Sequence, residues 1–88
     1  MFIAIEHDIH DPEQFQECAE EVFPLPDELH VHQFYPATDM NRAVCLYEAP
    51  SIDRLSEYLD NKLGKSSTQQ YFPVLGEQSI GLPGKIHS

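Results

Sequence analysis

Two histidines separated by one residue, His30 and His32, form the clearest local pattern for chemistry in this 88-residue chain. On a β-strand, residues two apart share a face with their Cβ atoms about 7 Å apart, so the two imidazoles could reach one metal ion. Glu6 and Cys45 could complete such a site with a carboxylate and a thiolate. The alternatives are a solvated histidine pair on an edge strand, a Cys45 that packs as a small hydrophobic residue, and a Glu6 in water at a strand end.

The same region offers acid–base groups for a small organic molecule. In this interpretation His32 is the general base and Tyr47 orients or protonates the substrate, with Glu6 as a further acid–base group. Phe34 and Phe72 would line the pocket. The spacing of these residues does not distinguish this site from the metal site.

The strands that position these residues follow from the hydrophobic pattern. Residues 42–48 contain five successive apolar or nearly apolar side chains, which predicts a strand covered on both faces. Further strands are expected at 2–8, 28–35 and 70–75, with a polar turn between the second and third. Pro73 predicts that the last strand lies at an edge of the sheet or at a bulge.

Two amphipathic helices complete the pattern. Asp11 can cap a first helix whose apolar stripe runs from Phe15 to Phe23, before two prolines end it. Ser51 can cap a second helix, which Gly64 closes. The resulting order β-α-β-β-α-β predicts an α+β fold, the ferredoxin-like plait, with both helices on one face of a four-stranded antiparallel sheet. Residues 1–75 would form this domain, and residues 76–88 an irregular C-terminal arm.

Regular strands would divide the side chains between two faces of the sheet. The expected contacts of the helices are Ile3, Ile5, Leu29, Val31, Val44 and Leu46. The opposite face would carry Phe2, Ala4, Glu6, His30, His32, Phe34, Ala43, Cys45 and Tyr47. This face is too apolar to remain in water, so we expect a homodimer, or a higher homo-oligomer, built as a dimeric α+β barrel.

The net charge of the chain limits the classes of partner that it could bind. The chain has 5 basic and 15 acidic residues, a net charge of −10, which argues against nucleic acid and against an anionic membrane surface. No apolar run approaches the roughly 20 residues of a membrane span. Two cysteines without a dense disulfide pattern favour a reducing compartment, so the expected location is cytoplasmic.

Several short strings resemble a family of small bacterial ferredoxin-like proteins in the dimeric α+β barrel superfamily, of which a nickel-binding member is known. They are F-I-A-I-E-H-D at 2–8, H-Q-F at 32–34, C-L-Y-E-A-P-S at 45–51, and L-G-K-S-S-T-Q-Q-Y-F-P-V at 63–74 with I-G-L-P later. The resemblance implies the plait, the dimer and binding of nickel or another divalent transition metal. By this resemblance, the binding-site positions of the family correspond to Glu6, His32, Cys45 and Tyr47. The loop at 36–41 is longer than in the nickel-binding pattern, and the segment after the second helix differs.

These observations predict a protein that binds a divalent transition metal or a small ligand on the inner sheet face, in metal handling or sensing. The expected metal ligands are His32, Glu6 and Cys45, with His30 as a further candidate. The alternative is a cofactor-independent monooxygenase or isomerase of the same superfamily, acting on a small hydrophobic substrate. A pure assembly module without a ligand is the third interpretation.

Overall fold

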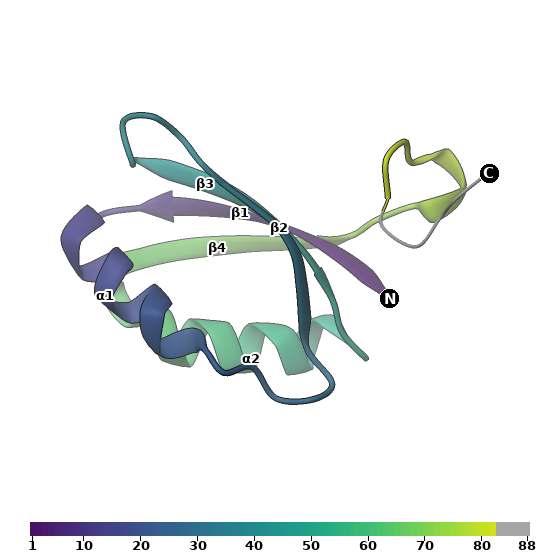
Figure 1. Ribbon diagram of the computed structural model, residues 1–88, viewed down its shortest axis with the longest axis horizontal. Helices are drawn as coiled ribbons and strands as arrows, with labels where there is room; N and C mark the ends of the chain where they lie inside the picture. Colours follow the sequence, from purple (N-terminus) through teal and green to yellow (C-terminus); the bar gives the residue numbers. More distant parts are fainter. Residues whose placement is uncertain (83–88) are drawn as a thin grey trace.

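The chain forms two layers, a four-stranded sheet and a pair of helices that covers one of its faces (Figure 1). The computed structural model describes residues 1–82. The strands are β1 (Phe2–Ile9), β2 (His30–Pro36), β3 (Arg42–Glu48) and β4 (Ser67–Pro73), and the helices are α1 (Pro12–Val22) and α2 (Ile52–Leu63). This α+β arrangement has the element order and the layers of the predicted ferredoxin-like plait.

The sheet order is β2-β3-β1-β4, with all neighbours antiparallel. β1 and β3 therefore occupy the centre, as their apolar sequences predicted. β4 lies at an edge and ends at Pro73, so the proline removes no hydrogen bond from the middle of the sheet. Beyond β4, a single 3₁₀ turn (Gly76–Gln78) belongs to the predicted arm, of which 83–88 lie outside the described residues.

Both helices begin where capping chemistry predicted. The Asp11 carboxylate accepts a hydrogen bond from the backbone N–H of Gln14 at 3.2 Å, and the Ser51 hydroxyl accepts one from Arg54 at 3.1 Å. α2 ends at Gly64, whose φ of 57° lies in the region that favours glycine. A second 3₁₀ turn (Gly64–Ser66) then leads into β4.

The predicted face assignment is right for β1 and wrong for β3. Ile5 faces the helices as expected, and it pairs directly with Cys45. Residues paired across antiparallel strands point to the same face, so Cys45 also faces the helices. Ala43, Cys45 and Tyr47 are accordingly buried in the core, and Val44, which was expected there, is 46% exposed on the other side.

β2 contains a bulge, and the side chains that follow it lie on the opposite face of the sheet from the one that a regular strand would give them. Val31 pairs with Tyr47 and Gln33 with Leu46, so His32 is the extra residue between them. Past the bulge, Phe34 pairs with Cys45 and turns toward the helices, although it was expected on the opposite face. A regular strand would have kept Phe34 on the same face as His32.

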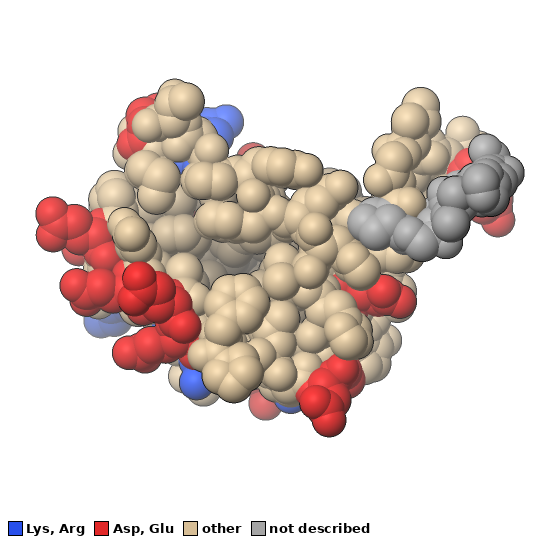
Figure 2. Space-filling model, in the orientation of Figure 1, with Lys and Arg blue, Asp and Glu red and all other residues tan. Residues whose placement is uncertain are grey.

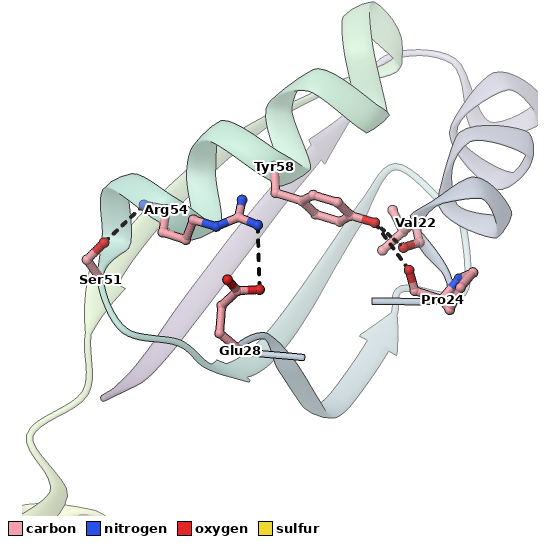
Figure 3. A network of polar contacts seen from close by, with 6 residues as sticks. All are labelled: Val22, Pro24, Glu28, Ser51, Arg54 and Tyr58. Carbon is pink, nitrogen blue, oxygen red and sulfur yellow. Dashed lines mark hydrogen bonds and ion pairs between the residues drawn. The ribbon is translucent and has the colours of Figure 1, made fainter. Parts of the chain in front are cut away.

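The loop between α1 and β2 is held against α2 by polar contacts (Figure 3). The Tyr58 hydroxyl donates a hydrogen bond to the carbonyl of Val22 at 2.6 Å and lies 3.5 Å from that of Pro24. The Arg54 guanidinium lies 3.5 Å from the Glu28 carboxylate. These contacts join the end of α1 and the start of β2 to one side of α2.

Removing the Tyr58 hydroxyl is expected to loosen this loop. Tyr58→Phe should lower the free energy of unfolding by about 0.5–1.5 kcal/mol, because the Val22 carbonyl loses its donor. The measurement is urea unfolding followed by circular dichroism. Arg54→Gln is the control, since a half-exposed ion pair contributes less than about 1 kcal/mol. A larger loss in Arg54→Gln than in Tyr58→Phe would contradict this assignment.

Candidate functional site

The four residues proposed as metal ligands do not meet in one place. Glu6 lies on the open face of the sheet, opposite Val44, and Cys45 lies under the helices. His30 and His32 are on the open face near one end of β2, where His30 pairs with Glu48. Within residues 1–82 no group of three or more His, Cys, Asp or Glu side chains is placed to hold a metal ion. The proposed ligand set therefore does not fit a metal site within one chain.

His32 has a different carboxylate partner from the one expected. Its Nε2 lies 3.0 Å from the Glu48 carboxylate, and its ring lies 5.4 Å from that of Phe2. His32 is the extra residue of the bulge in β2, and Glu48 is the last residue of β3. His32 and Glu48 could together offer a metal ion two ligands, one nitrogen and one oxygen.

A cavity of about 140 Å³ lies between the helices and the sheet. Its walls come from α1, α2, β1, β2 and β3, and they are almost entirely apolar. The lining residues are His7, Phe15, Ala19, Val22, Phe23, Val31, Phe34, Cys45, Tyr47, Leu59 and Leu63. A cavity of about 150 Å³ with such walls can stay dry and hold one benzene ring, so this space has the size and polarity for a small apolar molecule.

The cavity opens to solvent beside Phe23, which follows α1, and Phe34, which lies on β2. Two of its lining residues, Phe23 and Phe34, are 54% and 45% exposed, so they stand at its mouth. Figure 2 shows that face hollowed between the positions of α1 and β2, with uncharged atoms around the hollow and acidic residues gathered farther out over α1. The lining residues of the cavity include no Asp, Glu, Lys or Arg.

Two buried polar side chains, those of His7 and Cys45, lie at the inner end of the cavity. The Nε2 atom of His7 lies 3.0 Å from the sulfur of Cys45, and both residues are buried. Burial raises the pKa of the Cys45 thiol to about 12, so the sulfur stays protonated at neutral pH. Burial also lowers the pKa of His7, against smaller opposing effects of the Gln69 hydrogen bond and the Asp60 charge. Both groups are therefore neutral at pH 7.

His7 is a residue of the cavity that was not among the site residues predicted from sequence. The available signal was its position, because His7 is the polar residue in an inward series with Ile3, Ile5 and Ile9. A buried histidine needs hydrogen-bond partners, and the second one is Gln69 on β4, 3.2 Å from Nδ1. Gln69 could not have been found from spacing, since 62 positions separate it from His7.

The residues predicted to line a ligand pocket are divided between two faces. Tyr47 and Phe34 line the cavity, and burial raises the pKa of the Tyr47 hydroxyl, which stays protonated. Phe72 is 53% exposed on the open face, where it pairs with Ala4. His32, predicted as the general base, also lies on that face and does not line the cavity.

The lowered pKa of His7 makes stability depend on pH. In the unfolded chain His7 titrates near 6.5, and in the folded chain it titrates at a lower pH. Between these two values the unfolded state binds more protons, so the free energy of unfolding falls as pH decreases through that window. Urea unfolding at pH 7, 6 and 5.5 should show this loss.

His7→Gln provides the comparison for that experiment, because the amide cannot titrate and remains polar. Its unfolding should be less sensitive to pH than that of the wild type between pH 7 and 5.5. His10→Gln removes an exposed histidine bonded to Thr68, and the pH sensitivity should fall more in His7→Gln than in this control. Equal pH sensitivity in wild type and His7→Gln would show that other groups dominate.

Comparison of the chain with models of known families, with curated proteins and with solved structures finds no match. The family resemblance therefore stays a prediction. In the part of the chain that the structure describes, no helix is long and apolar enough to cross a membrane.

Proposed function

We propose that this protein binds a small, largely apolar molecule, about the size of one aromatic ring, in the cavity between the helices and the sheet. The observation that carries the proposal is the cavity itself, with about 140 Å³ of space, apolar walls and a single neutral imidazole–thiol pair at its inner end. Apolar cavities with a few convergent polar groups are typical of small-molecule sites. The site thus lies on the helix side of the sheet and not on the inner face expected from sequence.

The binding energy would come from removing ring surface from water. Transfer of apolar area contributes about 25 cal/mol per Å². Phe15 supports aromatic contacts, since its ring already packs edge-on against His7 at 5.7 Å. An anion would be excluded, because no Lys or Arg is among the residues that line the cavity.

Toluene tests this proposal directly. Saturating toluene should raise the melting temperature of the wild type, because a ligand that binds only the folded state stabilises it. Ala19→Leu should abolish that rise by filling the cavity from α1, and Ala37→Leu, in the turn after β2, should retain it. No stabilisation of the wild type by toluene or xenon would overturn the proposal.

We further propose that the protein is a homodimer that pairs through the open face of the sheet. This face carries the apolar side chains of Phe2, Ala4, Tyr35, Val44, Leu46 and Phe72. Tyr35, Val44 and Phe72 are each about half exposed or more, at 59%, 46% and 53%. An apolar patch of this kind usually marks an interface.

The charge distribution favours a second copy as the partner. Each chain has a net charge of −10, so two chains repel each other unless they meet through a weakly charged surface. Glu6, Asp8 and Glu48 are the acids that the sheet register places on the open face, together with the basic Arg42. Most of the 15 acidic residues lie elsewhere, with a group over α1, and they would point away from the partner (Figure 2).

Metal binding and turnover remain predictions. The contact of His32 with Glu48 is the remaining basis for nickel or another divalent metal in one chain, and elemental analysis of dialysed protein would test it. If the protein is an enzyme on a small hydrophobic substrate, the base in the cavity is His7 and not His32. Recovery of the bound compound unchanged by mass spectrometry would separate binding from turnover.

A further inference from the structure

A chain of hydrogen bonds runs from the surface of α2 to the inner end of the cavity. Asp60 on α2 accepts from the side-chain amide nitrogen of Gln69 at 2.8 Å, and it also accepts from the Tyr71 hydroxyl at 2.7 Å. Gln69 contacts His7, and His7 contacts Cys45. The order Asp60–Gln69–His7–Cys45 therefore links a surface carboxylate to the cavity.

The first link sets the orientation of Gln69. An ionised carboxylate can only accept hydrogen bonds, so the group that Gln69 turns toward Asp60 must be its NH₂. The carbonyl oxygen Oε1 then faces the other way, toward His7 and toward the Ser67 hydroxyl, which donates to it. The opposite orientation of the amide would place two acceptors against each other at Asp60.

The second link sets the tautomer of His7. A neutral imidazole has one N–H donor and one acceptor nitrogen, and the Gln69 oxygen carries no proton. Nδ1 must therefore be the N–H that donates to Gln69, 3.2 Å away. Nε2 is left as an acceptor, and its partner at 3.0 Å is the thiol of Cys45, which is a weak donor. The cavity thus presents Nε2 of His7 as a hydrogen-bond acceptor, and a stronger donor could replace the Cys45 thiol as its partner.

We propose that the ligand is a phenol, that is, a small aromatic ring whose hydroxyl group donates a hydrogen bond to Nε2 of His7. This inference rests on the proposed function, and it names the chemical class of the ligand. A phenolic hydroxyl is a stronger donor than the Cys45 thiol, so it makes the stronger hydrogen bond to Nε2. Ring ethers and ketones have only acceptors and would gain nothing at Nε2, and the aromatic wall formed by Phe15, Phe23 and Phe34 suits the ring.

The affinities of phenol, anisole and toluene for wild type and for His7→Leu test the proposal. Phenol loses more hydration than toluene on entering any apolar cavity, so the informative quantity is the ratio of their affinities in each protein. Calorimetric titration should show that the phenol-to-toluene ratio falls about three- to tenfold in His7→Leu, and that the anisole-to-toluene ratio does not change. His10→Leu, at an exposed position, should keep the wild-type ratios.

Two outcomes separate the phenol assignment from the proposed function. Toluene binding to both proteins with an unchanged phenol-to-toluene ratio would overturn the phenol assignment and leave the proposed function standing. No binding of any of the three compounds to the wild type would overturn the proposed function itself. If His7→Leu does not fold, ¹⁵N spectra of the wild-type histidines decide the matter, because a proton on Nε2 of His7, or no change of its resonance on adding phenol, contradicts the assignment.

Discussion

Leu59→Ala is expected to lower the free energy of unfolding by about 2–5 kcal/mol and to enlarge the ligand site at the same time. Leu59 is 1% exposed and its side chain lines the cavity from α2. Truncating it removes buried apolar atoms and joins their volume to space that is already present. The variant should therefore bind naphthalene, which the wild-type cavity is too small to hold, and naphthalene should restore part of the lost stability.

Leu55→Ala is the matched control. Leu55 lies one turn earlier on the same face of α2 and is 0% exposed, but it does not line the cavity. It should lose a similar free energy of unfolding and show no recovery with naphthalene. Urea unfolding with and without the compound measures both effects. Equal recovery in the two variants, or none in either, would contradict the position assigned to the cavity.

Val44→Asp is expected to convert a dimer into monomers. Val44 is 46% exposed on the open face, so within one chain the change should cost only about 1 kcal/mol, because aspartate is a poor strand residue and lies opposite Glu6. In a symmetric dimer, each copy would bury an unpaired carboxylate, at a cost of several kcal/mol. The dissociation constant of the dimer should rise by more than about a hundredfold, since 1.4 kcal/mol is tenfold.

Light scattering at micromolar protein concentration measures this change. Asn61→Asp is the control, because it adds the same charge on the exposed side of α2, away from the open face. It should remain dimeric. A wild-type mass of one chain would contradict the proposed dimer, and so would a Val44→Asp variant that stays dimeric.

The elements of the fold could be predicted from sequence because each has a local cause. Asp11, Ser51 and Gly64 mark helix ends through their own chemistry, and Pro73 indicates an edge strand wherever the strand pairs. These signals depend on neighbouring residues only. The strand order could also be predicted from sequence, since the two strands with the most continuous apolar sequence lie at the centre of the sheet.

The site could not be predicted in the same way, because it depends on register. A shift of one residue reverses which face a side chain occupies, and the hydrophobic run in β3 is equally apolar on both faces. The sequence therefore did not show that Cys45 lies beside His7 rather than beside His30 and His32. The bulge at His32 likewise reversed the face on which Phe34 lies. No turn residue or proline in the sequence indicates this bulge.

The two outer strands also restrict how the protein can aggregate. β2 and β4 expose the unpaired backbone of the sheet, and a flat strand there would recruit further strands without limit. β2 is interrupted by its bulge and ends at Pro36, and β4 ends at Pro73. These features oppose edge-to-edge growth into fibrils. Association of this protein should therefore involve the open face of the sheet rather than the addition of strands at its edges.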